Sequence, residues 1–440
     1  MMDLVAARLQ MAVSLGFHII FASIGIAMPF FMAFSHYKWL KGGGEHFLLL
    51  TRAWSKGVAM FFAVGAVSGT ALSLELGLLW PEFMKHAGPI IGMPFSWEGA
   101  AFFLEAIALG LFLYGWGRLR PWTHWFAGLS VGICGVLSGL FVICANGWMN
   151  SPSGFDWVEG RAVNIDPVAA MFNRAALMQG IHMTVAAFQA TAFAVAGVHA
   201  VQLLRRPDSV IHNSALRIAL AFGVVASIVQ PITGDLLAKD VAIRQPVKLA
   251  AMESLFQTQT YAPGLIGGIP DSKSRTVRYG VEIPGLLSFL AKGSFGAEVE
   301  GLDKTPEDEW PPVAIVHGAF QLMVACGSAL AVLALVIAAG FLRYPSLFAS
   351  RRFLWCVAFA APLGFVAIEA GWTVTEVGRQ PWIIYRIFRT ADALTPMPGL
   401  VVSLIVFAGL YGLLSWLLVF LMRRQVSSLN AVEAKGGSGD

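Results

Sequence analysis

The stretch from 365 to 385, FVAIEAGWTVTEVGRQPWIIY, begins as an apolar segment and ends with acidic and basic side chains that could do chemistry. Glu369 and Glu376 are seven residues apart, so both carboxylates lie on one face of a helix. Placing a carboxylate in or near a bilayer is costly, which makes an intramembrane acid a functional hypothesis by default. Pro381 should end the helix shortly after Arg379, because proline lacks an N–H. The stretch therefore offers an anionic ligand beside a cation at a membrane boundary. A Glu–Arg pair that only fixes helix packing is the alternative.

Four side chains of the types that ligate haem iron fall in separate apolar segments, on the side of the membrane that we expect to be external: His18, His182, Met323 and Glu376. A His/Met pair is typical of a low-spin electron-transfer haem. His182 and Met323 could approach one iron from opposite faces, whereas His18 and Glu376 would each leave a position open for oxygen. Taken one at a time, a hydrogen-bonded packing histidine or a core methionine is the alternative.

Two further carboxylates, Glu98 and Glu105, lie seven residues apart in SWEGAAFFLEA. They step about 10 Å along one helical face, which suits a proton relay. Glu75, in the preceding apolar segment, could belong to the same network. Hydrogen bonds that only join helices are the alternative for all three residues.

The segment QPVKLAAMESLF carries Lys248 and Glu253 in an otherwise apolar, amphipathic sequence. A substrate hydroxyl could donate its proton to Glu253 and be oriented by Lys248. A surface salt bridge is the alternative. We assign no ligand role to the other histidines, and the four cysteines are expected to be small packing residues because all lie in apolar segments: Cys134, Cys144, Cys326 and Cys356.

The elements that must position these side chains are membrane helices. The chain has 440 residues, of which 57% are hydrophobic and 13% charged, and its mean hydropathy is +0.69. These values are typical of a polytopic membrane protein. The fold class we predict is all-α, with nine transmembrane helices and one long extracytoplasmic loop. The expected spans are 11–35, 54–80, 96–116, 123–146, 176–203, 214–233, 313–341, 353–378 and 398–422.

The distribution of Lys and Arg predicts the orientation. The loops after spans one, three, five and seven, together with the tail, hold 15 Lys and Arg residues, and the opposite side holds seven outside the long loop. The positive-inside rule therefore places the N-terminus outside and the C-terminus in the cytoplasm. The expected parts are helices one to six over 1–233, the loop over 234–312, helices seven to nine over 313–422, and a flexible cytoplasmic tail over 423–440.

Two other classes of protein are compatible with intramembrane carboxylates. A proton-coupled secondary transporter would use them to carry protons, but such transporters are often built from inverted repeats, and we find no internal repeat. A purely structural or assembly subunit would need no ligand-type residues at all. Redox spectra of the purified protein would discriminate these classes.

The motifs around these residues resemble those of subunit I of the cytochrome bd quinol oxidases over most of the chain. GWxxxExGRQPW, with its intramembrane glutamate, is the most specific of them. The loop is short, as in the short-loop or cyanide-insensitive branch. The other motifs follow in the family's order: RLQ ahead of His18, WEGxxFFLE, CANGWM, QGIHMTVA, QPxKLAAxE and FQLM.

The resemblance implies His182 and Met323 as axial ligands of a low-spin haem b. It implies His18 and Glu376 as ligands at a di-haem oxygen site, with a high-spin haem b and a haem d or a further haem b. Which of these two ligands serves which high-spin haem is open, because relatives differ.

The resemblance also implies the remaining roles. Glu98 would lie beside the oxygen site and Glu105 in the proton path, while Arg379 would compensate haem propionates. Lys248 and Glu253 would serve quinol oxidation. The supporting cofactor-binding residues would be Arg8, Asn146 and Trp372.

The implied activity is quinol:O2 oxidoreduction, with quinol oxidised at the outer face and O2 reduced to water using cytoplasmic protons. The implied partners are subunit II of the oxidase and a small single-span subunit. The implied location is the bacterial cytoplasmic (inner) membrane. Nucleic acid is not an expected partner, because the basic residues are scattered over the loops and form no stripe.

Overall fold

The computed structural model describes residues 2–436, and long helices dominate this part of the chain. Nine helical segments within it are long and apolar enough to cross a membrane, as predicted. The helices that form them are α1 (Met2–Leu40), α2 (Glu45–Leu79), α3 (Pro81–Tyr114), α4 (Pro121–Asn150), α6 (Arg174–Arg205), α7 (Val210–Arg244), α10 (Val313–Leu342), the consecutive pair α11 (Arg351–Ala360) and α12 (Leu363–Val377), and α13 (Leu400–Gly436).

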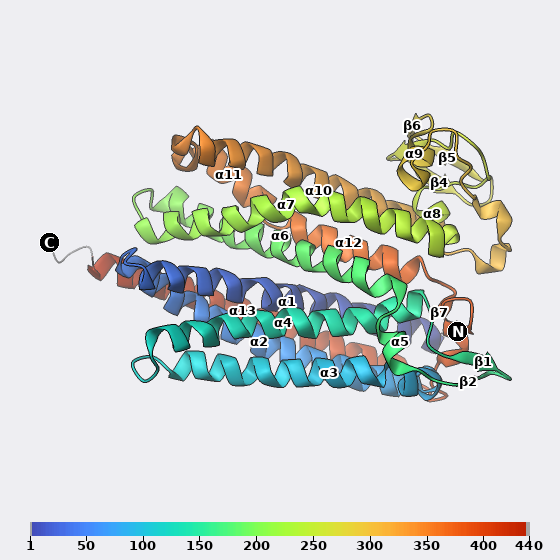
Figure 1. The fold of residues 1–440 in the computed structure, drawn as a ribbon, viewed down its shortest axis with the longest axis horizontal. Coiled ribbons are helices and arrows are strands. Elements are labelled where there is room, and N and C mark those ends of the chain that lie inside the picture. The colour runs from blue at the N-terminus through green and yellow to red at the C-terminus, as the bar shows by residue number, and fades with distance from the viewer. Residues whose placement is uncertain (1, 437–440) are drawn as a thin grey trace.

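The long helices run roughly along one axis and form an elongated bundle (Figure 1). In that view α6, α7, α10, α11 and α12 form the upper half, and α1, α2, α3, α4 and α13 the lower half. The N-terminus, the short strands and the long loop lie at one end, and the C-terminus at the other. The two ends can therefore be treated as separate environments.

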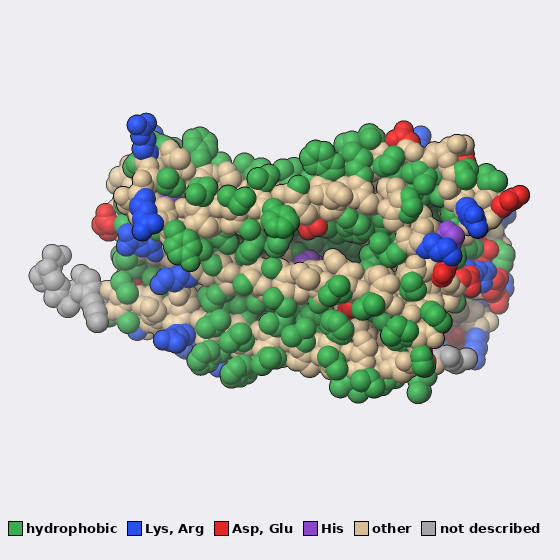
Figure 2. Space-filling model, turned by 90° about the horizontal axis from the view of Figure 1, so that it is seen from below, with side chains coloured by type: hydrophobic (Ala, Val, Ile, Leu, Met, Phe, Trp, Pro, Cys, Tyr) green, Lys and Arg blue, Asp and Glu red, His purple; other side chains and the backbone are tan. Residues whose placement is uncertain are grey.

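The surface of the bundle is that of a membrane protein. On the face in Figure 2, hydrophobic side chains form a broad belt, Lys and Arg gather at the end with the C-terminus, and acidic and basic side chains mix at the other end. The belt contains a hollow near its middle, where a histidine and acidic side chains are visible. Polar side chains at mid-belt are expensive in lipid, so the hollow indicates a site.

Several helices extend beyond the apolar segments that predicted them: α3, for example, begins at Pro81 and not near 96, and α7 extends into the expected loop. α7 continues to Arg244, so the first part of the expected loop, 234–244, is helical. Ion pairs four residues apart, Asp235 with Lys239 and Asp240 with Arg244, stabilise this polar extension. Hydropathy alone predicts an end of α7 that is too early, because ion pairs and not apolar side chains stabilise its last turns.

The tail also differs from the expectation of a flexible segment over 423–440. α13 is helical as far as Gly436, and residues 437–440 lie outside the described part. Ser209 Oγ donates to the Glu433 carboxylate at 2.6 and 2.8 Å, and Arg206 donates to the Asn430 carbonyl oxygen. These contacts fix the end of α13 against the turn between α6 and α7.

The connection between α7 and α10 is an ordered cap with its own short elements. Its hairpins are two-stranded and antiparallel, β3 with β6 and β4 with β5. Buried apolar residues of this cap pack against α7, α10 and α12. The elements are α8 (Pro246–Met252), β3 (Gly264–Ile266), β4 (Ile269–Asp271), β5 (Thr276–Arg278), β6 (Val281–Ile283), α9 (Leu286–Lys292), η1 (Leu302–Lys304) and η2 (Glu307–Glu309).

The remaining short elements connect the long helices. β1 pairs with β2 and β7 with β8, both antiparallel, and β1, β2, α5 and β7 lie at the same end of the bundle as the cap (Figure 1). These elements are β1 (Asp156–Val158), β2 (Arg161–Val163), α5 (Pro167–Met171), η3 (Pro345–Ala349), β7 (Trp382–Ile384), β8 (Phe388–Arg389) and η4 (Thr390–Ala393).

Candidate functional site

His18 faces α2 from the middle of α1. Its Nδ1 is 2.9 Å from Ser68 Oγ, and a Cβ added at Gly69 would lie 3.0 Å from His18 Cε1. The ring is half-buried, and its Nε2 has no hydrogen bond to the described residues. Metal-binding histidines typically use the second ring nitrogen for such a bond, which orients the ring. His18 therefore has the arrangement of a ligand with Nε2 available.

His182 on α6 resembles His18 at Nδ1 but not at Nε2, which has a polar neighbour. Its Nδ1 is 3.0 Å from Thr233 Oγ1 on α7, and the Gln230 amide lies 3.3 Å from its Nε2. Met323 comes from a different helix, α10, where its Sδ would be 3.0 Å from a Cβ placed on Gly371 of α12. Both side chains are half-buried. Glycine at position 371 thus leaves room for the thioether between α10 and α12.

Glu376 lies in the last turn of α12, inside a short polar network. Asn146 Nδ2 donates to its Oε1 at 2.5 Å, and Arg379 Nη2 donates to its Oε2 at 2.5 Å. α12 ends at Val377, so Arg379 lies in the following turn, slightly beyond the helix end. Arg379 is 2% exposed, and its Nε and Nη1 have no partner among the described residues. Glu376 already pairs with this buried cation, and its two free N–H donors need further acceptors.

Asn150 extends this network to the loop, a role that the sequence analysis missed. Lys248 Nζ donates to Asn150 Oδ1 at 2.7 Å, and Asn150 Nδ2 donates to Asn146 Oδ1 at 3.0 Å. Asn146 in turn donates to Glu376. Each amide accepts through oxygen and donates through nitrogen, so the bonds all point from Lys248 toward Glu376. Asn146 and Asn150 are four residues apart and therefore lie on one helical face, and this spacing could have indicated the role of Asn150 from the sequence.

Lys248 and Glu253 do not contact each other in the described network. Lys248 also donates to the Thr375 carbonyl oxygen, so it is directed into the bundle. Burial, and then the Arg379 charge, lower the pKa of Lys248 well below its usual value. Burial raises the pKa of Glu253 to about 7, partly offset by a backbone hydrogen bond from Leu265. A carboxyl group with this pKa can exchange a proton near neutral pH.

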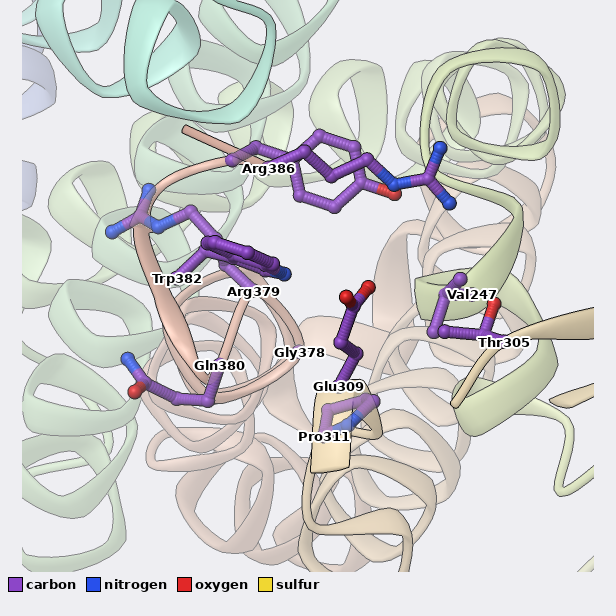
Figure 3. Close-up of a pocket in the computed structure, with 10 residues that line it drawn as sticks. Val247, Thr305, Glu309, Pro311, Gly378, Arg379, Gln380, Trp382 and Arg386 are labelled. Carbon is purple, nitrogen blue, oxygen red and sulfur yellow. The ribbon is translucent and has the colours of Figure 1, made fainter. Parts of the chain in front are cut away.

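A small pocket lies between the loop and the turn after α12 (Figure 3). Arg379, Trp382 and Arg386 contribute to one part of its wall, and Val247 and Thr305 to another. The Glu309 carboxylate points into the space between them. The pocket therefore places an acidic side chain of the cap, Glu309, opposite the basic side chains Arg379 and Arg386 of the segment after α12.

Glu98 and Glu105 both face α4. Ser138 Oγ donates to Glu98 Oε1 at 3.2 Å, and a Cβ added at Gly135 would lie 3.6 Å from Glu105 Oε1. Glu105 is 6% exposed. The two carboxylates thus line the contact between α3 and α4. Glu75 is not joined to them by a hydrogen bond, since its partner is Gln10 on α1.

The supporting residues lie near the same end. Arg8 Nη2 donates to Gln380 Oε1 at 3.0 Å in the turn that holds Arg379. Trp372 Nε1 and Glu369 Oε1 are buried without a partner among the described residues. Unpaired buried polar groups are rare in native structures and usually indicate a missing water, ion or ligand.

His317 has contacts that suit a structural role, whereas both ring nitrogens of His36 are buried without a partner in the described part of the chain. Both ring nitrogens of His317 lie within hydrogen-bond distance of backbone carbonyl oxygens, 2.8 Å from Met252 and 3.0 Å from Gly267, so His317 fixes the cap to α10. The four cysteines are free thiols in the described chain; Cys326 is buried, as expected of a packing residue, whereas Cys356 is exposed.

These observations test whether the residues fit haem. His18 and His182 each lie within hydrogen-bond distance of a hydroxyl through Nδ1, and Met323 lies against a glycine. Two buried donors of Arg379 lack acceptors among the described residues, which a haem propionate could supply. Within 2–436, no three His, Cys, Asp or Glu side chains gather around one point as a bare metal ion would need. Haem iron requires only one or two protein ligands, because the macrocycle supplies the others. The donor set therefore fits haem.

The chain is similar to known proteins over almost its whole length. This chain is similar to a chain in the structure of the bd oxidase from Geobacillus thermodenitrificans. The two share 36% sequence identity at a TM-score of 0.92, and the match covers 97% of this chain and 98% of the Geobacillus chain. The cytochrome bd ubiquinol oxidase subunit 1 of Bacillus subtilis (strain 168) is 30% identical over 444 residues, which is 97% of this chain and 94% of the relative.

A more distant relative agrees with these two. The cytochrome bd-II ubiquinol oxidase subunit 1 of Escherichia coli (strain K12) is 28% identical over 489 residues and 95% of each chain. The family model described as "Cytochrome bd terminal oxidase subunit I" matches residues 6–429. The chain therefore belongs to the family of subunit I of the cytochrome bd terminal oxidases.

Proposed function

We propose that this chain is the haem-containing subunit of a quinol:O2 oxidoreductase, and that the residues described above divide the reaction between them. Family membership favours this activity over a proton-coupled transporter or a structural subunit. The observation that carries the assignment of the site is the network from Lys248 through Asn150 and Asn146 to Glu376, with the unpaired donors of Arg379 beside it. It joins the loop to the interior of the bundle.

His182 and Met323 would hold a low-spin haem b, since they come from different helices and provide the typical donor pair. His18 and Glu376 would be ligands at the oxygen site, to a high-spin haem b and to a haem d or a further haem b. Bound haem supplies one-electron transfer and oxygen reduction. Ser68 and Thr233 orient the two imidazoles through Nδ1, which supports ligation through Nε2.

Quinol oxidation is assigned to the cap formed by the long loop, 245–312, together with the end of α7. Glu253 accepts a quinol proton, because its raised pKa of about 7 lets it take up and release protons near neutral pH. Lys248 is a positioning residue: it orients Asn150, and through it Asn146 and Glu376. The released protons leave at the outer end, where the cap is exposed.

Protons for water formation come from the opposite side. Glu105 and Glu98 succeed one another along the contact of α3 with α4, and Ser138 orients Glu98 toward the interior. We place the Lys- and Arg-rich end with the C-terminus in the cytoplasm and the N-terminus outside, on the positive-inside rule, in the bacterial inner membrane. Quinol oxidation outside and proton uptake inside then conserve energy without a pump.

Subunit II of the oxidase is the expected partner, and a small single-span subunit completes the proposed complex. Lipid-facing apolar side chains on α13, many of them exposed, give such partners a surface within the membrane.

Pyridine haemochrome and reduced-minus-oxidised spectra of the purified complex test the proposal. We expect haem b in low- and high-spin forms, and a far-red band if haem d is present. A preparation with quinol oxidase activity, but without a His/Met low-spin signal, would contradict the ligand assignment. A preparation without haem would contradict the function itself.

A further inference from the structure

Four buried polar atoms without protein partners gather where α1, α2 and α13 meet. They belong to side chains that are at most 3% exposed. The atoms are Gln10 Oε1, Ser14 Oγ, Glu75 Oε2 and Tyr411 Oη. Gln10 Nε2 donates to Glu75 Oε1 at 3.1 Å, and Ser14 is close to Glu75 and Tyr411 but has no hydrogen bond of normal length to either. No single helix accounts for the group, because three helices contribute to it.

The chemistry of these atoms identifies what would satisfy them. A carboxylate oxygen and an amide oxygen accept hydrogen bonds, whereas the two hydroxyl groups can both donate and accept. No salt bridge among residues 2–436 involves Glu75, so the site provides no cation for it. Buried water usually makes two to four hydrogen bonds to groups of this kind. Water, or its protonated form, is therefore the ligand class that fits.

The position of the cluster relates it to His18. On α1, Gln10 and Ser14 precede His18 by eight and four residues, which places all three on one helical face. On α2, Glu75 follows Ser68 by seven residues, and Ser68 is the hydroxyl partner of His18. Polar side chains thus run on both helices from His18 toward the outer end of α2, over about 10 Å.

This line is separate from the inner carboxylates. Glu98 and Glu105 face α4, and no hydrogen bond in the described chain joins them to Glu75, whose partner is Gln10. The polar neighbours of His18 thus lie in the direction of Gln10, Ser14 and Glu75, which the proposed proton path along α3 and α4 does not use. This direction is available to the product of oxygen reduction.

We propose that Gln10, Ser14, Glu75 and Tyr411 bind ordered water and form the outward route by which product water leaves the His18 site. The water site stands on the unpaired atoms alone, whereas the exit role rests on the proposed function. The two parts can be tested separately.

A water-resolving cryo-electron microscopy structure of the purified complex tests the site. We expect at least one water within hydrogen-bond distance of Glu75 and of Ser14 or Tyr411. In Glu75→Leu, or in the milder Ser14→Ala and Tyr411→Phe double variant, this water should be lost while the haem spectrum stays unchanged. Direct protein hydrogen bonds that satisfy all four groups, with no water between them, would overturn the site.

Turnover measurements test the exit role. With Glu75→Leu we expect maximal turnover to fall several-fold at saturating quinol, with KM and haem content unchanged, and Glu75→Gln should retain most of the activity. Glu82→Gln, a change at an exposed acid that begins α3, is the matched control. Full turnover after loss of the water would overturn the exit role. A wild-type complex without quinol oxidase activity would contradict the proposed function instead.

Discussion

Buried polar networks lie at both ends of this bundle, and they differ in whether the protein satisfies them. At the end with the C-terminus, which is the inner end in the proposed orientation, Trp54 Nε1 donates to His199 Nε2 at 3.3 Å, and His199 Nδ1 is 2.8 Å from His212 Nδ1. His212 Nε2 is 2.8 Å from Asn430 Oδ1, and Asn430 Nδ2 donates to Gln202 Oε1. The indole N–H fixes the direction of the chain: His199 must carry its proton on Nδ1, and His212 on Nε2.

The outer network is organised in the same way but is incomplete. The bonds from Lys248 to Glu376 also have one direction, yet two nitrogens of Arg379 and one of Trp372 remain buried without partners. A complete network stabilises helix packing, whereas an incomplete one requires something from outside the chain. The comparison teaches that a buried histidine or carboxylate by itself says little, because His36, at the same end as the complete network, is also buried without partners among residues 2–436. Unsatisfied neighbours identify a site only where ligand-type side chains from several helices lie beside them.

The largest effect should follow from removing a ligand at the outer end. Met323→Leu replaces the thioether by a side chain of similar volume that cannot bind iron, so the low-spin haem signal should disappear and quinol oxidase activity should fall to background. Reduced-minus-oxidised spectra check this. Met32→Leu, at a fully buried methionine in the inner half of α1, should leave the spectrum unchanged. Survival of the low-spin band in Met323→Leu would remove Met323 from the site.

Glu253→Gln should lower turnover by about 100-fold, because it removes the general base from quinol oxidation. Burial raises the pKa of Glu253 to about 7, and only the ionised form can accept a proton. The wild-type rate should therefore rise with pH through about 7 and then level off, as measured in a pH profile at saturating quinol. The profile should be low and flat in Glu253→Gln. The control is Glu282→Gln, at an exposed glutamate of the cap, which should keep the wild-type pH profile. If Glu253→Gln also kept the wild-type profile, Glu253 would not be the general base.

The direct comparison of the networks uses two asparagines. Asn150→Leu breaks the connection between Lys248 and Asn146, and we expect about a 10-fold loss of quinol turnover, with a shifted high-spin haem spectrum. Asn430→Leu breaks the inner network and should lower the melting temperature without altering spectrum or turnover. If both variants behaved alike, completeness of a network would not separate function from packing.

The smallest effect is expected at the tail. Ser209→Ala removes the hydrogen bond to the Glu433 carboxylate and should destabilise the protein by about 1–2 kcal/mol, as measured by thermal or denaturant unfolding of the complex. Haem content and turnover should not change. A loss of haem in this variant would show that the inner end also supports the cofactor sites.

Much of the architecture follows from the sequence. The nine apolar segments predict nine membrane helices because lipid leaves the backbone no partner except itself. The spacing predicts that Arg379 lies one turn from Glu376, and in the structure the two side chains pair at 2.5 Å; the ligand role of Glu376 stays a prediction. The helical ends of α7 and α13 could not be read from hydropathy, because ion pairs and contacts with distant turns maintain them.

The sequence alone determined the class of the protein, the order of its helices and the types of side chain that could hold iron. Only the tertiary structure decided which polar groups meet. Lys248 and Asn150 are 98 positions apart, and Glu75 joins Gln10 from 65 positions away. Hydropathy and spacing describe one helix at a time, whereas a hydrogen bond between helices depends on how they pack. The unsatisfied groups become visible only when that packing is known.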